Sequence, residues 1–376
     1  MMQFIDLNAQ YRALKVEIDA NIHAVLDSAQ FIGGPYVREL EDKLATFTGR
    51  KHCITCANGT DALLAACMAL NIGPGDAVFC TDITMVASVE PAKLLGAAPV
   101  FCDIDPRTYN LSAASLERQI KAVLAEGRLR PKTVIAVDIF GNPCDYDAIL
   151  PICEKYGLVL IEDAAQSFGA SYHGERCGSF GRIAATSFFP AKPLGCYGDG
   201  GAIFTDDDGL DKLLRSLCVH GKGPGGKYDN VRVGLNSRLD AIQAAVLLPK
   251  LKALEEYELE ARQRVAKRYN EAFAGWLTTP YVAESCVSAY AQYVLLAEDT
   301  AQRDKIATHL SGENIPNMIY YPTPQHILPV FRDAPQYGED FPNAVDYCAR
   351  TVSLPMHPYL TDAEQQVVIE TVLEVM

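Results

Sequence analysis

The sequence predicts an α/β protein in which helices cover a mostly parallel, seven-stranded sheet, followed by a smaller α+β domain. Three observations support this. Residues 52–206 alternate short apolar runs with amphipathic stretches, which is typical of a parallel sheet. A long helical stretch then spans 237–273, and the chain beyond it mixes short strands and helices. We expect two domains. The large domain spans 1–248 and includes an N-terminal arm, and the small domain spans 249–376.

The elements of the large domain follow from the residue pattern. Apolar runs predict strands at 52–57, 76–81, 98–103, 133–140, 158–164, 184–189 and 201–206. Amphipathic stretches predict helices at 59–71, 85–96, 112–126 and 146–157. Ligands of such sheets bind beyond the carboxyl ends of the strands, so we expect functional residues directly after the apolar runs.

The rest of the chain is less regular. We expect Pro249 to kink or divide the long helix, because proline cannot donate the helical hydrogen bond. Strands are predicted at 289–297 and 351–356, and helices at 300–312 and 362–375.

Composition excludes several classes of protein. The net charge of −14 argues against a nucleic-acid partner. No apolar stretch reaches 18 residues and the N-terminus lacks an apolar leader, so we expect neither a membrane span nor a signal peptide. Twelve cysteines without a regular framework favour a reducing cytoplasm. Cys53 and Cys56 lack a second ligand pair, so we expect inert buried thiols and no metal.

The segment "ANGTDAL" (57–63) lies between a predicted strand and a predicted helix. Free backbone N–H groups at a helix start attract anions, and Gly59 and Thr60 would offer such groups to a phosphate. An ordinary helix cap is the alternative.

A strand-end carboxylate occurs in "VLIEDAAQSFGA" (159–170), where Asp163 ends an apolar run. A buried carboxylate needs a partner, and a protonated pyridine nitrogen is one such partner. Capping of the next turn is the alternative interpretation.

Lys192 lies in "SFFPAKPLGCYGDGGAIF" (187–204), where no acidic residue occurs within six positions. Burial lowers the pKa of a lysine, and a neutral amine is what Schiff-base chemistry requires. A lysine that reaches the surface past apolar neighbours is the alternative. Together with the phosphate segment and Asp163, however, Lys192 fits a site for pyridoxal 5′-phosphate (PLP).

Here the sequence resembles a known family across essentially the whole chain. The segments "ANGTDAL", "IEDAAQSFGA", "SFFPAKPLGCYGDGGAIFT" and "VGLNSRLDAIQAA" are similar in order and spacing to the PLP-dependent sugar aminotransferases of the DegT/DnrJ/EryC1/StrS family. The start of the chain and "YYPTPQH" (320–326) follow the same pattern. The resemblance implies PLP fold type I, the aspartate aminotransferase-like architecture.

The resemblance also implies roles for individual residues. Lys192 would bind PLP as a Schiff base, Asp163 would pair with the pyridine nitrogen, and Gln166 would contact the ring hydroxyl. Gly59, Thr60 and Ser187 would hold the phosphate, and Asn236 would reach it from the neighbouring subunit of a homodimer. The positions that match residues near the substrate are His220, Tyr321 and His326. Met85 stands where the family usually carries an aromatic residue stacked on the ring.

The implied reaction is transamination of a nucleotide-linked keto-sugar, with L-glutamate giving 2-oxoglutarate. The segment around Lys192 is most similar to the branch that aminates C3 of UDP-2-acetamido-2-deoxy-3-keto-D-glucuronic acid, in surface polysaccharide (O-antigen type) biosynthesis. Arg232, Arg238 and the Lys222/Lys227 loop are candidates for binding this anion, although each could be a solvated surface residue.

Alternative functions remain open. One is C4 amination of a UDP- or dTDP-linked 4-keto-6-deoxy sugar. A sugar dehydratase of the family would carry histidine in place of Lys192, and a nicotinamide-dependent oxidoreductase would need a G-x-G-x-x-G segment that "CANGTDA" does not supply. A non-catalytic regulatory protein of the same fold is a further alternative.

Overall fold

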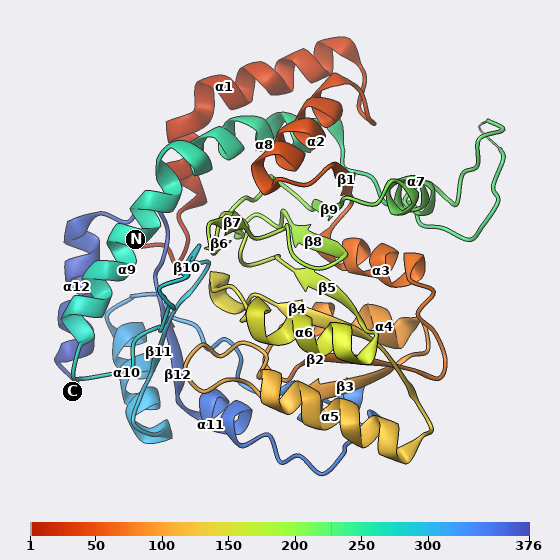
Figure 1. Ribbon diagram of the computed structural model, residues 1–376. Coiled ribbons are helices and arrows are strands. Elements are labelled where there is room, and N and C mark those ends of the chain that lie inside the picture. The colour runs from red at the N-terminus through yellow and green to blue at the C-terminus, as the bar shows by residue number, and fades with distance from the viewer. Residues whose placement is uncertain (1, 227) are drawn as a thin grey trace.

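The computed structural model describes residues 2–226 and 228–376. Within these residues, seven strands form one sheet in the order β1-β9-β8-β5-β4-β2-β3 (Figure 1). Only β9 of this sheet runs antiparallel to its neighbours, so the predicted mostly parallel sheet is confirmed. The strands are β1 (His52–Cys56), β2 (Asp76–Thr81), β3 (Ala98–Cys102), β4 (Arg130–Val137), β5 (Val159–Asp163), β8 (Ile183–Ser187) and β9 (Gly201–Thr205).

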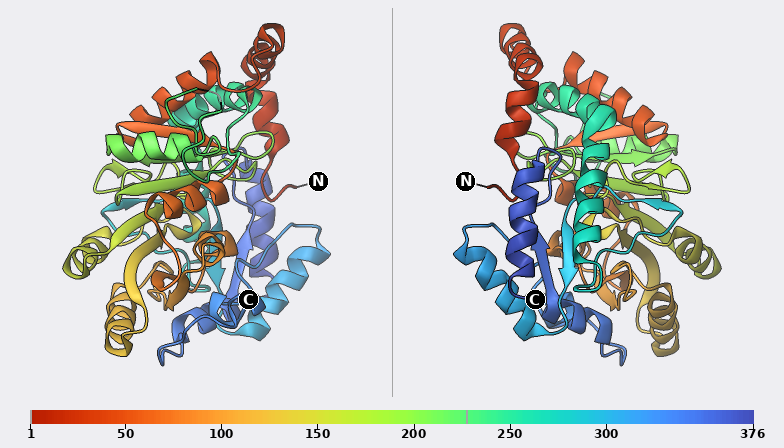
Figure 2. Two further views of the ribbon diagram at one scale, coloured as in Figure 1. Left: turned by 90° about the vertical axis from the view of Figure 1, so that its right-hand side faces the viewer. Right: turned by 90° about the vertical axis from the view of Figure 1, so that its left-hand side faces the viewer.

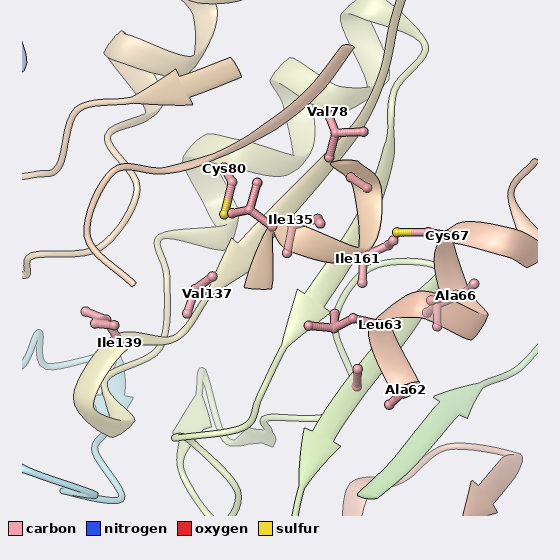
Figure 3. Close-up of a cluster of buried hydrophobic side chains, with 14 of the residues drawn as sticks. Ala62, Leu63, Ala66, Cys67, Val78, Cys80, Ile135, Val137, Ile139 and Ile161 are labelled. Carbon is pink, nitrogen blue, oxygen red and sulfur yellow. The ribbon is translucent and has the colours of Figure 1, made fainter. Parts of the chain in front are cut away.

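Helices cover both faces of the sheet, because side chains alternate between the faces along each strand. One face packs against α3 (Gly59–Ala69), α4 (Glu90–Leu94) and α7 (Asp208–Leu217). The other packs against α2 (Pro35–Thr48), α5 (Ala113–Glu126), α6 (Tyr146–Tyr156) and α8 (Ala241–Ala253). Figure 3 shows the apolar face of α3, with Ala62, Leu63 and Ala66, against residues of β2, β4 and β5 such as Val78 and Ile161.

The N-terminal helix α1 (Leu7–Ser28) lies along α8, outside the sheet (Figure 1). The chain leaves the large unit through α8, a π turn η3 (Leu254–Glu258) and α9 (Leu259–Phe273). The predicted helix over 237–273 therefore begins at Ala241 and ends as expected. Pro249 does not divide this helix, because it lies inside α8, and the π turn interrupts the regular helix instead.

The elements of the C-terminal part lie together on one side of the molecule (Figure 2), and they share an apolar core of their own. Strands β11 (Tyr293–Leu296) and β12 (Thr351–Leu354) pair antiparallel, and α9, α10 (Thr300–Gly312) and α12 (Asp362–Leu373) pack beside them. The helix α11 (Pro342–Arg350) contributes to the main core as well. A further small sheet contains β10 (Cys286–Val287), β6 (Ser171–Tyr172) and β7 (Glu175–Arg176).

Two other expectations are refined. The predicted helix over 85–96 is a short 3₁₀ turn, η1 (Val86–Ser88), followed by α4, because Pro91 favours a new helix start at this point. The expected domain boundary at 248/249 falls inside α8 and stays a prediction. Across the described ranges, none of the helices has the length and hydropathy needed to cross a bilayer.

Candidate active site

A cavity of about 440 Å³ lies at the carboxyl edge of the sheet. Its walls come from the segments that follow β1, β2, β5 and β8, as the sequence predicted. Seven predicted site residues line it: Gly59, Thr60, Met85, Asp163, Gln166, Ser187 and Lys192. The topology therefore brings together residues that are up to 133 positions apart, from 59 to 192.

The start of α3 forms one wall of the cavity. The side chain of Asn58 caps the helix by accepting from the N–H of Asp61 at 2.7 Å. The first N–H groups of a helix have no intrahelical acceptor, so those of Gly59 and Thr60 stay available to an anion. A Cβ on Gly59 would lie 2.7 Å from Cβ of Ser187. This position therefore needs glycine, and the cap and the anion site coexist.

Asp163 ends β5 and is buried. Its Oδ2 accepts from Ser88 Oγ at 2.7 Å, and its Oδ1 accepts from the N–H of Ala165 at 3.1 Å. Thr84 Oγ1 lies 2.8 Å from Ser88 Oγ and extends this chain of hydroxyl groups. Burial raises the pKa of Asp163, and the hydrogen bonds and the charge of Lys192 oppose the rise.

The neighbouring carboxylate, Glu162, takes a different part in the fold. Its oxygens accept from the N–H groups of Gly178 at 2.6 Å and Phe180 at 2.7 Å. Neighbouring strand residues point to opposite faces of the sheet, and Glu162 is absent from the described walls of the cavity. Asp163 is therefore the member of the pair that faces the site.

Lys192 is half-buried against the loop that follows β8. Burial lowers the pKa of Lys192, while the negative charge of Asp163 opposes this. Its backbone N–H donates to the carbonyl of Phe189 at 2.9 Å, which fixes a tight turn. A lysine in this setting has a larger neutral, nucleophilic fraction than a solvated one.

Gln166 connects the cavity to the C-terminal part of the chain. Its Oε1 accepts from the N–H of Phe140 at 2.7 Å, and its Nε2 donates to the hydroxyl of Tyr321 at 3.1 Å. Tyr321 is absent from the described cavity wall but contacts it through Gln166.

His326 forms a pair with a carboxylate that the sequence analysis did not single out. The ring Nδ1 of His326 lies 2.6 Å from Oδ2 of the buried Asp82, and the backbone N–H of His326 donates to Oδ1 of the same carboxylate at 2.8 Å. Burial raises the pKa of Asp82 and His326 opposes this. The His326 ring stacks on Phe341 with centroids 4.4 Å apart.

Four predicted residues lie elsewhere, on the segment between α7 and α8, the middle of which projects from the body (Figure 1). Arg238 donates to the Asn236 side chain, and Arg232 donates to the Ser216 hydroxyl. His220 is exposed and has a positive φ of 55°. None of the four lines the cavity among the described residues of the same chain. Lys222 lies on this segment too, and Lys227 falls outside the described residues.

The residues present fit PLP. The Gly59–Ser187 contact leaves a backbone cradle that a side chain would fill, as a phosphate site requires. A buried carboxylate suits a protonated pyridine nitrogen, and a lysine of lowered pKa suits an aldehyde. With its sheet of aminotransferase type, the chain falls in the class of PLP-dependent enzymes of fold type I.

Comparison with known proteins narrows this class. The model of the DegT/DnrJ/EryC1/StrS aminotransferase family matches residues 12–373, and the chain belongs to this family. Aminotransferases of this family depend on PLP, so the protein is a PLP-dependent nucleotide-sugar aminotransferase.

Individual relatives agree with this assignment. A UDP-2-acetamido-2-deoxy-3-oxo-D-glucuronate aminotransferase from Pseudomonas aeruginosa is 46% identical over 98% of both chains. A UDP-N-acetyl-3-dehydro-alpha-D-glucosamine 3-aminotransferase from Acidithiobacillus ferrooxidans is 39% identical over 98% of this chain and 96% of its own. A family aminotransferase from Brucella abortus superimposes with a TM-score of 0.96 at 47% identity, over 100% of this chain and 99% of its own.

Proposed function

We propose that the protein aminates C3 of UDP-2-acetamido-2-deoxy-3-keto-D-glucuronic acid with L-glutamate as donor. The observation that carries the proposal is Lys192 in one cavity with Asp163 and the Gly59–Ser187 cradle. The choice of sugar is supported by the two relatives above, whose names both specify a 3-keto sugar.

Lys192 has two tasks in this proposal. As a neutral amine, its Nζ would hold the cofactor through the aldehyde group, and as a free amine it would accept the proton from the donor Cα on Nζ. The lowered pKa of Lys192 serves both tasks, because a protonated amine can neither attack nor accept a proton. When bound, PLP supplies the electron sink and carries the amino group between the two half-reactions.

The remaining residues orient the cofactor. Asp163 holds the proton on the ring nitrogen, and Ser88 and Ala165 fix the direction of its carboxylate. Gln166, which is itself held by Phe140, is placed to contact the ring hydroxyl. Thr60 and Ser187 contribute hydroxyl donors to the phosphate, and Met85 offers an apolar surface to the ring.

A homodimer with shared active sites belongs to the proposal. Among the described residues, Lys192 is the one cationic side chain of the cavity wall, whereas Asp61, Asp163 and Asp199 are acidic. A cofactor phosphate and a UDP-uronate would add further negative charge. The segment between α7 and α8 carries Asn236, His220, Arg232 and Arg238, none of which is among the described residues that line the cavity of the same chain, and a second copy could receive them.

The biological setting follows from this chemistry. An amino-uronate on UDP is a building block for a surface polysaccharide of the O-antigen type. We place the reaction in the cytoplasm, where UDP-sugars and glutamate occur, and the twelve free cysteines are consistent with a reducing compartment.

The decisive experiment is an absorbance spectrum of the purified protein loaded with PLP. We expect a yellow chromophore that bleaches when L-glutamate is added and returns with 2-oxoglutarate. Lys192→Ala should bind PLP without this colour. A wild-type protein that stays colourless with added PLP contradicts the proposal.

The sugar is tested separately, with UDP-linked 3-keto-uronate and 4-keto-6-deoxy sugars supplied to the glutamate-loaded enzyme. Return of the yellow colour with the 3-keto sugar alone supports C3 amination. Return with the 4-keto sugar alone assigns the enzyme to C4 amination.

A further inference from the structure

A second lysine, Lys250, is buried behind the loop that carries Lys192. It lies on α8 and is 1% exposed. Its Nζ donates to the carbonyl of Gly195 and lies 4.7 Å from the ring centroid of Tyr197. An apolar side chain of similar volume would fill this space without the cost of desolvating a charge. A buried ammonium at this position therefore calls for an explanation beyond packing.

The loop that Lys250 holds is tightly closed. The N–H of Cys196 donates to the carbonyl of Phe188 at 2.8 Å, so residues 188–196 form a loop with fixed ends. A Cβ on Gly195 would lie 2.4 Å from the carbonyl oxygen of Pro190. Since the two sides of the loop are in contact, a displacement of Gly195 must also displace Lys192, three residues before it.

The π turn η3 brings a buried negative charge to the helix face of Lys250. Glu258 follows Lys250 by eight residues, which in a regular α-helix would separate the two side chains by about 80° around the axis. A π turn accommodates one extra residue and reduces this angle to roughly 20°. The turn thus places the buried carboxylate of Glu258 on the same helix face as Lys250.

Two side chains from distant parts of the chain hold Glu258. Its carboxylate accepts from Gln10 Nε2 of α1 at 2.9 Å and from the hydroxyl of Tyr359 at 2.7 Å. Arg262, one helical turn further along, is 3% exposed and donates to the carbonyl of Tyr290 at 3.0 Å. Burial lowers the pKa of Lys250 to about 8, and the charge of Glu258 opposes this shift.

We infer that Lys250 is a positioning residue, whose side chain holds the 188–196 loop by the Gly195 carbonyl and so aims Lys192 into the cavity. The inference rests on the proposed role of Lys192. The buried charges on α8, η3 and α9 link this loop to α1 and to the C-terminal part of the chain. The position of Lys192 in the cavity thereby depends on the helical segment that joins the two cores.

The test compares Lys250→Met with Lys252→Met, a matched change of an exposed lysine two positions along the same helix. In the glutamate half-reaction we expect Lys250→Met to lower kcat about 10- to 100-fold, because small misplacements of a reacting group have effects of this size. KM for glutamate should change less than about twofold, and Lys252→Met should match the wild type. Lys250→Arg, which keeps a donor, should restore most of kcat.

Two further measurements separate positioning from a general loss of stability. Methionine removes a buried charge, so Lys250→Met should melt within a few degrees of the wild type. Amide hydrogen exchange over 189–197 should be faster in the cofactor-free variant than in the cofactor-free wild type. Wild-type kcat together with wild-type exchange in Lys250→Met overturns the inference.

The outcomes also separate this inference from the proposed function. A wild-type protein that forms no chromophore contradicts the proposed function, while the exchange experiment still decides whether Lys250 holds the loop. If Lys250→Met does not fold, Lys250→Leu, which also lacks a donor for the Gly195 carbonyl, takes its place with the same expected outcomes.

Discussion

Lys192 owes its reactivity to two opposing effects that come from different parts of the chain. Burial by its own loop lowers its pKa, and the charge of Asp163, from another strand, raises it. The sequence shows no acidic residue within six positions of Lys192. The carboxylate that influences the amine is instead supplied by the topology, 29 residues earlier.

A second buried residue makes the stability of the fold depend on pH. His357 is 3% exposed, and burial and then the charge of Arg262 lower its pKa from 6.5 to about 4. As the pH falls below 6.5, the unfolded chain binds a proton at His357 and the folded chain does not. The contribution of neutral His357 to the free energy of unfolding is therefore complete above pH 6.5 and is lost as the pH falls toward 4. We expect this contribution to be about 3 kcal/mol.

Urea unfolding at a series of pH values measures this effect. His357→Gln, which cannot titrate, should lose less stability than the wild type between pH 6.5 and pH 4. Parallel pH profiles for the two proteins would show that His357 does not carry the difference.

The candidate site was predictable from the sequence only in part. Gly59, Asp163 and Lys192 each follow an apolar run, which is a local signal. Ser88 gave no such signal, because it lies in a predicted helical stretch, where short polar residues are usually solvated or caps, and its partner Asp163 is 75 residues away. Asp82 does follow a predicted strand, but its partner His326 lies 244 residues away, so only the folded chain reveals the pair.

At the scale of elements, the strands were predicted within about three residues at each end, since each is an apolar run bounded by turn residues. The antiparallel direction of β9 was not predictable from its composition. Neither α1 nor α2 was recognised, and the π turn has no pattern of its own. Such features depend on packing between distant segments.

The start of α3 allows an element-level prediction. In Gly59→Ala, the new Cβ would meet Ser187 at 2.7 Å and push the helix start away from β8. Overpacking of this kind costs about 1–3 kcal/mol, so we expect PLP affinity to fall about 10- to 100-fold. Fluorescence titration of the cofactor-free protein measures this loss.

Gly73→Ala is the matched control. A Cβ at Gly73 lies 3.8 Å from its nearest neighbour, an ordinary contact, and this variant should bind PLP as the wild type does. If Gly59→Ala also binds PLP normally, the start of α3 is not the phosphate cradle.

At the scale of the whole molecule, Asn236 is not among the described residues that line the cavity of its own chain, which leads to a prediction about subunit exchange. Lys192→Ala lacks the reactive amine, and Asn236→Asp brings a negative charge to the proposed phosphate contact of the partner. In a mixed dimer, one site combines both defects and the other has neither. Refolding the two inactive proteins together should therefore restore about a quarter of wild-type activity, since half of the dimers are mixed.

Activity no greater than that of the two separate variants would mean that each chain completes its own site. A mass measurement on the same samples shows whether dimers form at all, so that a failure of assembly is not mistaken for independent sites.

The position of β1 has a consequence for protein synthesis. Within the described part of the chain, β1 pairs with β9 alone among the strands, through contacts such as Cys56 with Gly201. A ribosome adding roughly 5–20 residues per second needs on the order of 10–30 s to make the intervening chain. During that time β1, with its cysteines and apolar side chains, has no strand to pair with. The strand that later leads into the phosphate cradle is therefore available to chaperones during translation.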